Sequence, residues 1–144
     1  MKLIHKIYGT GQPLIIMHGL FGSGDNWRSI ARMMEPHYQS IVVDMRNHGR
    51  SPHDPEMNFQ VMADDILELM TDLKLEKVSL LGHSMGGKVA MQFSLLYPAL
   101  VEKLIVVDIA PKYYPPHHDV VIEAIESIDP KQLTDRMEAE NAMA

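Results

Sequence analysis

Four short, almost unbroken apolar runs are the feature that most constrains the fold of this chain. They are Leu14–Met17, Ile41–Val43, Val78–Leu81 and Leu104–Val107. A strand that is buried on both faces is apolar at nearly every position, whereas a strand with one solvent-exposed face alternates between apolar and polar residues. Each run stops at a polar or glycine-rich stretch, which is typical of a strand end. A looser alternation over Lys2–Tyr8 predicts an edge strand ahead of them.

Helical patterns fill the intervals between these runs. They predict helices over Asp25–Met34, Asn58–Leu73 and Met85–Tyr97. In the second helix, apolar residues recur at steps of three and four, while Asp64, Asp65 and Glu68 face away from that stripe. Asn58 is its predicted N-cap, because a short polar side chain there accepts a hydrogen bond from the first turn.

This alternation of strands and helices predicts an α/β fold with a doubly wound, mostly parallel sheet. The carboxyl ends of parallel strands share one rim, and open α/β sheets bind their ligands there. The residues that directly follow the four apolar runs are therefore the first candidates for a site. That rim is predicted to carry His18, Asp44, Ser84 and Asp108.

Composition excludes several classes of protein. The 144 residues include 13 Lys and Arg against 19 Asp and Glu, a net charge of −6 that argues against a nucleic-acid partner. Because the chain has no cysteine, disulfides, a thiolate zinc site and a cysteine nucleophile are excluded. No apolar stretch is long enough to predict a signal peptide or a membrane span, so we expect a cytoplasmic protein without a membrane partner.

The segment Gly82-His83-Ser84-Met85-Gly86 fits the pattern G-x-S-x-G, and it lies between a predicted strand and a predicted helix. On such a sharp turn, a serine hydroxyl is raised clear of the sheet, and the flanking glycines avoid backbone clashes. The pattern alone is weak, but its position at a strand-to-helix junction is specific. Ser84 is the predicted nucleophile.

The loop after the first apolar run, from His18 to Gly22, predicts the second half of an oxyanion hole. In an acyl-transfer site of this kind, one donor is the backbone N–H that follows the nucleophile, here Met85. The other donor comes from the loop after the earlier strand. Leu20 is the favoured second donor, with Phe21 next.

Four blocks of sequence resemble the α/β-hydrolase fold, and within it the small serine esterases of the YbfF type. The blocks are His18–Ser23, Asp44–Ser51, Gly82–Lys88 and Val107–Pro111. They follow the family's order and cover the chain from about residue 2 to about residue 118. The resemblance implies hydrolysis of a small-molecule carboxylic ester or acyl thioester through a Ser–acid–His triad and an acyl-enzyme, with no cofactor and no metal.

Asp108 is the favoured acid of that triad. Some members of the family carry the acid after the sixth strand, and the run Leu104–Val107 corresponds to that strand. Ser84 and Asp108 are one βαβ unit apart, so they are predicted to end neighbouring strands. Asp44 is the weaker candidate, because the family's stretch around it is mostly structural, with Arg46 pairing locally.

The resemblance places the catalytic histidine after an eighth strand, for which this chain has no counterpart. Residues 1–112 then correspond to the N-terminal part of the hydrolase core and 113–144 to the start of a helical cap, with helices over Asp119–Ile128 and Lys131–Met143. The expectation is a core truncated after the sixth strand and within the cap. Such a chain would be inactive alone and would self-associate through its exposed sheet edge.

The histidines of the chain offer no convincing replacement for this base. His48, on a rim loop, is the least unsuitable of them. His18 is structural in the family, and His83 is expected to point to the wrong side of the nucleophile. The adjacent pair His117 and His118 predicts a solvated helix start rather than a metal site.

Two alternatives to the esterase prediction remain open at this stage. A cofactor-free haloperoxidase or a C–C bond hydrolase uses the same triad, so the elbow motif does not distinguish them. A non-enzymatic binding or signalling protein could keep the pocket without the chemistry. Since the nucleophile position holds serine rather than aspartate, a dehalogenase or an epoxide hydrolase is disfavoured.

Overall fold

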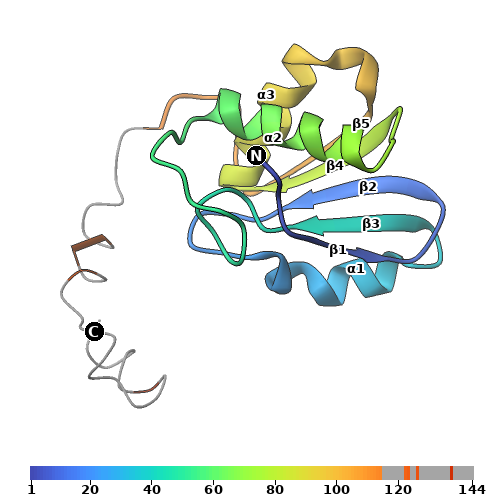
Figure 1. The fold of residues 1–144 in the computed structure, drawn as a ribbon, viewed down its shortest axis with the longest axis horizontal. Coiled ribbons are helices and arrows are strands. Elements are labelled where there is room, and N and C mark those ends of the chain that lie inside the picture. The colour runs from blue at the N-terminus through green and yellow to red at the C-terminus, as the bar shows by residue number, and fades with distance from the viewer. Residues whose placement is uncertain (115–121, 124–125, 127–136, 138–144) are drawn as a thin grey trace. The chain divides into compact units, whose positions relative to one another are not determined.

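The computed structural model describes residues 1–114, 122, 123, 126 and 137, and Met1–Pro111 form one compact unit. Its sheet contains β1 (His5–Tyr8), β2 (Gln12–Met17), β3 (Tyr38–Val43), β4 (Val78–His83) and β5 (Val101–Val107). The helices are α1 (Arg28–Met34), α2 (Phe59–Asp72) and α3 (Met85–Leu96), with 3₁₀ turns η1 (Gly24–Trp27) and η2 (Pro98–Leu100). Figure 1 shows their arrangement.

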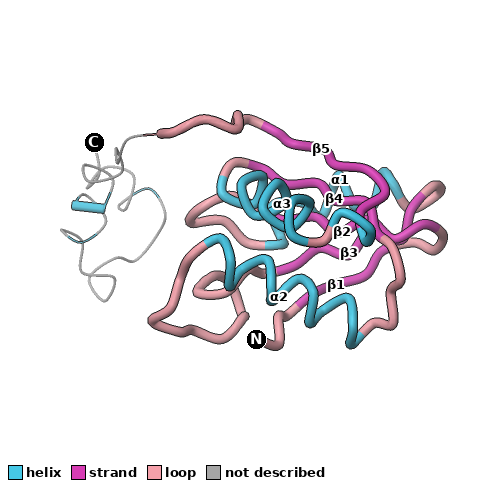
Figure 2. The backbone as a smooth tube through the Cα atoms, turned by 90° about the horizontal axis from the view of Figure 1, so that it is seen from above, coloured by secondary structure: helices cyan, strands magenta, loops and turns pink. Residues whose placement is uncertain are grey.

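The strand order is β1-β3-β2-β4-β5. Only β1 runs antiparallel to its neighbour, and the pairs β2–β3, β2–β4 and β4–β5 are parallel. The mostly parallel α/β sheet predicted from the apolar runs is therefore confirmed. The burial predicted for the fourth run is wrong, because Leu104 and Ile105 are each 40% exposed on β5, which is the last strand of the described sheet. The helices lie on both sides of it, with α2 and α3 on one face and α1 on the other (Figures 1 and 2).

Local sequence explains where the elements begin and end. The Asn58 side chain accepts a hydrogen bond of 2.9 Å from the Val61 N–H, which confirms the predicted N-cap of α2. The region predicted as one helix from Asp25 divides instead into η1 and α1. The first strand begins at His5 rather than Lys2. The helices expected over 119–128 and 131–143 fall largely outside the described residues.

One prediction about α2 is wrong. Asp65 was expected to face away from the apolar stripe with its acidic neighbours, but its side chain is 1% exposed. It forms two hydrogen bonds with the Arg46 guanidinium, of 2.6 Å to Nε and 2.9 Å to a terminal nitrogen. A buried carboxylate is tolerated here because a bidentate cation compensates for its lost hydration.

Candidate active site

The backbone at Ser84 has the strained geometry that a nucleophile elbow requires. Its φ of 50° and ψ of −111° join the end of β4 to the start of α3. A Cβ atom at Gly82 would lie 2.2 Å from the Gly86 carbonyl oxygen, and one at Gly86 would lie 2.4 Å from the Met17 carbonyl oxygen. Both glycines are therefore required by close backbone approach, and Ser84 is presented at the rim of the sheet.

The amides next to Ser84 have distinct roles. The Gly86 N–H donates to the His18 carbonyl (3.1 Å), which ties α3 to the end of β2. The Met85 N–H belongs to the first turn of α3, where helical N–H groups have no partner within the helix. Met85 thus remains the predicted first oxyanion donor, and the structure places its N–H in the residue after Ser84.

The loop after β2 is a tight turn with Leu20 and Phe21 at its centre. The Gly22 N–H donates to the Gly19 carbonyl (3.0 Å) and closes the turn. Phe21 has a φ of 59°, in the left-handed region that glycine or asparagine usually occupies in such turns. The structure places both candidate donors in one turn, next to the elbow, with the Phe21 side chain 58% exposed.

Asp108 follows β5 directly, in the position expected for the end of the neighbouring strand. The register pairs His83 with Val107, and the Ser84 N–H donates to the Val107 carbonyl (3.0 Å). Asp108 also has a left-handed φ of 56°, and its carboxylate is 82% exposed. One of its oxygens lies 3.6 Å from His83 Nε2. Sequence reasoning did not anticipate this approach of His83 to the acid.

His18 is buried and has both ring nitrogens engaged. Nδ1 lies 2.7 Å from the Gly19 carbonyl oxygen, and Nε2 accepts a hydrogen bond of 3.0 Å from the Met45 N–H. This pattern assigns the proton to Nδ1 and keeps the ring neutral. Burial lowers the pKa of His18, and His48, whose ring centre is 5.1 Å away, lowers it further. Through these two contacts, the His18 ring joins the start of the loop after β2 to the backbone at Met45.

The other described histidines do not supply a base either. His48 is buried, with Nδ1 2.8 Å from the Arg46 carbonyl oxygen. His5 is half-buried, with Nδ1 3.2 Å from the Leu3 carbonyl oxygen, and His37 and His53 are exposed. In the hydrogen bonds of residues 1–114, no histidine is joined to Ser84. His117 and His118 lie outside the described residues.

The Asp44 carboxylate joins two loops at the rim of the sheet. One oxygen accepts a hydrogen bond from the Gly24 N–H (2.7 Å) and the other from the Arg50 N–H (3.0 Å). A Cβ at Gly49 would lie 2.4 Å from the Asp44 carboxyl carbon, so the loop packs directly on this group. Arg46 is predicted to pair locally. It does donate to the Glu56 carbonyl in the same connection, but its ion pair is with Asp65 on α2, and the hydrogen bonds to Asp65 hold the pKa of Arg46 above its usual value.

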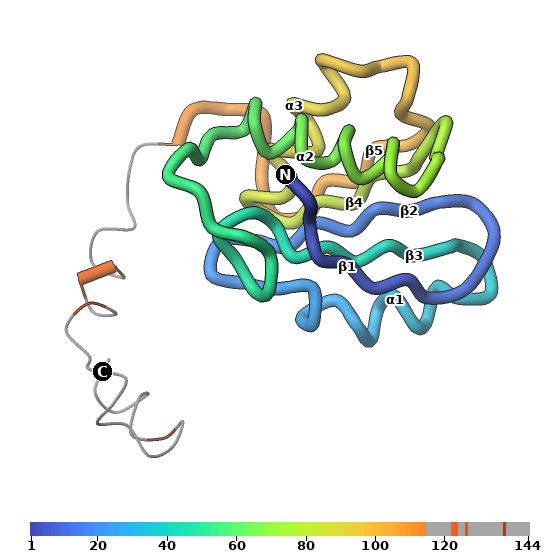
Figure 3. The backbone as a smooth tube through the Cα atoms, in the orientation of Figure 1, coloured from blue at the N-terminus to red at the C-terminus, as the bar shows by residue number. Residues whose placement is uncertain are grey.

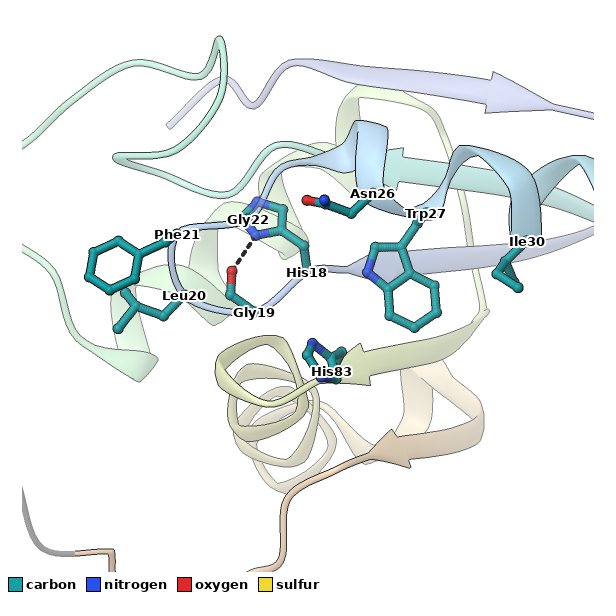
Figure 4. A pocket seen from close by; sticks show the side chains of 9 residues that line it. All are labelled: His18, Gly19, Leu20, Phe21, Gly22, Asn26, Trp27, Ile30 and His83. Carbon is teal, nitrogen blue, oxygen red and sulfur yellow. Dashed lines mark hydrogen bonds between the residues drawn. The ribbon is translucent and has the colours of Figure 1, made fainter. Parts of the chain in front are cut away.

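A cavity of about 500 Å³ opens beside the elbow (Figure 4). Its wall combines the loop after β2 with η1, α1 and the end of β4. The lining residues are His18, Gly19, Leu20, Phe21, Gly22, Asn26, Trp27, Ile30 and His83. In the sequence, Trp27 and Ile30 are spaced as on one face of a helix, so periodicity alone predicts that they pack in the core. No local signal distinguishes a side chain that faces a cavity from one that faces a core.

The comparisons with known proteins establish the family. A family model for the alpha/beta hydrolase fold matches residues 12–139, so the chain belongs to that family. It is 39% identical over 131 residues to Esterase YbfF of Escherichia coli (strain K12), a match that covers 90% of this chain and 52% of that protein. This confirms the resemblance drawn from the four sequence blocks.

Two further relatives extend this finding. The chain is 45% identical over 111 residues to the sn-1-specific diacylglycerol lipase ABHD11 of Danio rerio, covering 76% of this chain and 35% of that protein. A solved structure, "Marine microorganism esterase", matches with a TM-score of 0.93 at 46% identity, covering 99% of this chain and 57% of that one. The chain thus spans between 35% and 57% of the length of these three proteins.

Among the described residues, no helix is both long and apolar enough to cross a membrane. No group of three or more histidine or acidic side chains in the same residues is arranged to hold a metal ion.

Proposed function

We propose that this chain carries the nucleophile, oxyanion hole and acid of a serine hydrolase that acts on carboxylic esters or acyl thioesters. The observation that carries the proposal is the left-handed backbone of Ser84 between two glycines that tolerate no side chain. Strain of this kind persists where the surrounding structure imposes it, and it is concentrated at functional sites. Relatives named as an esterase and as a diacylglycerol lipase favour ester substrates over the cleavage of C–C bonds.

The proposed reaction begins with attack of Ser84 Oγ on the carbonyl carbon of the ester. A base takes the hydroxyl proton, and the N–H groups of Met85 and Leu20 stabilise the negative charge on the carbonyl oxygen, with Phe21 as the next candidate donor. The C–O bond then breaks, and the alcohol leaves with the proton. Water releases the acid from the acyl-enzyme by the same steps.

Asp108 acts in this proposal by orienting the base and stabilising its cationic form. Since the described histidines are not joined to Ser84, the base comes from outside these residues. We therefore expect the 144-residue chain alone to turn over esters very slowly. A serine without a neighbouring base is a weak nucleophile.

Free imidazole tests this proposal, because it can replace a missing base. Hydrolysis of p-nitrophenyl acetate would be measured for the wild-type chain and for Ser84→Ala over a series of imidazole concentrations. With imidazole present, the wild-type chain should hydrolyse the ester faster than imidazole alone does. Ser84→Ala should lose this additional rate. Asp108→Asn should reduce the same rate at least tenfold. Equal rates for wild type and Ser84→Ala at every concentration would overturn the assignment of the nucleophile.

A further inference from the structure

The cavity beside the elbow has the size of a small-molecule site. Its volume of about 500 Å³ falls within the range of roughly 300–1,000 Å³ that is typical of ligand pockets. In Figure 4, the Trp27 indole from η1 and the His83 ring from the end of β4 lie next to each other, beside the loop after β2. Ile30, one turn further along α1, extends the wall beside Trp27.

The cavity begins next to the proposed nucleophile. Gly19, one of its lining residues, packs against the elbow so closely that an added Cβ would lie 2.9 Å from His83 Nδ1 and 3.4 Å from the Ser84 Cβ. Leu20 and Phe21, which centre the oxyanion turn, line it as well. A group in this cavity would therefore be only a few bonds away from a carbonyl carbon held at Ser84.

The wall is suited to an uncharged apolar group. Trp27, Ile30, Leu20 and Phe21 provide hydrocarbon surface, and no lysine, arginine, aspartate or glutamate is among the residues that line the cavity. The rings of Trp27 and His83 are 6.0 Å apart between centroids and are tilted by 52°, an arrangement that leaves ring faces and edges for a further ring to pack on. Charged groups would lose hydration there without gaining a partner.

The strained backbone of Phe21 supports a ligand-facing role for this turn. A bulky residue in the left-handed region is costly, and such strain is kept mostly at functional sites. Ser84 and Asp108 also have a positive φ, so three of the five described non-glycine residues with this geometry lie at the end of β4, the end of β5 and the turn after β2; the other two are Asn47 and Lys74. Phe21 is the one of the three with no chemical group for catalysis, and it lines the cavity.

We propose that this cavity binds a compact, uncharged apolar ring of the substrate, from either the acyl or the alcohol part of the ester. The assignment to an ester rests on the proposed function, whereas binding of the ring does not require Ser84. Trp27 is the single tryptophan of the chain, so its fluorescence reports on this cavity alone. Cyclohexylmethanol and cyclohexanecarboxamide are suitable probes, because they represent the two parts of an ester and do not absorb with tryptophan.

The test is a fluorescence titration of the wild type and matched variants with each probe. We expect a saturable change in Trp27 emission with at least one probe. Ile30→Phe fills the cavity and should weaken binding at least tenfold. Met33→Phe adds the same ring to α1 at a position that is 75% exposed and outside the cavity, and it should bind like the wild type. Saturation by the alcohol assigns the cavity to the leaving group, and saturation by the amide assigns it to the acyl group.

A response that does not saturate with either probe, or equal affinities for wild type and Ile30→Phe, would overturn the proposal. If Ile30→Phe does not fold, Ile30→Ala tests the same wall by removing it, and it should also weaken binding several-fold. Ser84→Ala should bind each probe with the same affinity as the wild type does. The binding result therefore stands apart from the imidazole experiment, and each proposal can fail without the other.

Discussion

The two faces of the sheet are covered to different depths. Among the described residues, the face under α2 and α3 holds 17 buried apolar side chains, whereas the face under α1 holds five. Two long helices cover the first face, and one helix of seven residues covers the second. We infer that the α2–α3 face provides most of the stability of the fold. The cavity lies beside α1, where less of the side-chain surface is committed to packing.

Leu80 and Leu81 allow this difference to be measured with one residue type on one strand. Leu80 belongs to the α2–α3 core, and Leu81 belongs to the α1 core. Leu80→Ala should lower the free energy of unfolding by about 4 kcal/mol, and Leu81→Ala by about 2 kcal/mol, because a cavity under thin cover collapses more easily. Urea unfolding followed by circular dichroism measures both values. Equal losses would contradict the comparison.

The ion pair between Arg46 and Asp65 strengthens the α2–α3 side further. Asp65→Ala should cost about 3 kcal/mol, because it leaves the buried Arg46 guanidinium without its carboxylate. Asp72→Asn, at an exposed position on the same helix, is the control and should change stability by less than about 0.5 kcal/mol. Chemical denaturation of the two variants gives the result. A loss below about 1 kcal/mol for Asp65→Ala would show that the pair is not needed.

Acid sensitivity should come from the rim rather than from either core. The pKa of His18 is lowered by burial, so the unfolded chain binds a proton that the folded chain excludes. Stability should therefore fall as the pH drops below about 6.5, the ordinary value for histidine. His18→Gln, which keeps an acceptor for the Met45 N–H, should show a smaller decrease in Tm between pH 8 and pH 5. An identical decrease in both proteins would assign the acid response to other groups.

The smallest expected change in stability lies at the edge of the α1 face. Ile105 on β5 is 40% exposed on an edge strand, so Ile105→Lys should alter stability by less than about 0.5 kcal/mol. It should nevertheless reduce self-association in sedimentation velocity, since a lysine blocks strand pairing at an open edge. Met33→Lys makes the same charge change away from the edge and should leave self-association unaltered. Equal self-association in both variants would exclude this edge as the contact.

Most of the sheet could be predicted from sequence, because strands that are buried on both faces are apolar at consecutive positions. The N-cap of α2 was predictable for a similar reason, since Asn58 acts within its own helix. The exposure of β5 could not be predicted, because the run Leu104–Val107 is equally apolar although no further strand covers it in the described residues. Asp65 was not predictable, because its partner Arg46 lies 19 residues earlier and helical periodicity carries no information about a distant cation. The position of Ser84 was predicted from the elbow pattern, whereas the cavity beside it depends on how η1 lies against β4.

The long connection between β3 and α2, residues 44–58, should resist proteolysis although it contains no helix or strand (Figure 3). It is fastened to the core by Asp44 and Arg46 and closed on itself by Asn47, which exchanges two hydrogen bonds with Asp54. A protease needs several residues of extended, detached backbone in order to cut. Trypsin should therefore spare both arginyl bonds in this connection, after Arg46 and after Arg50, although the Arg50 side chain is well exposed. In the folded protein, residues 44–58 should therefore remain intact during digestion with trypsin.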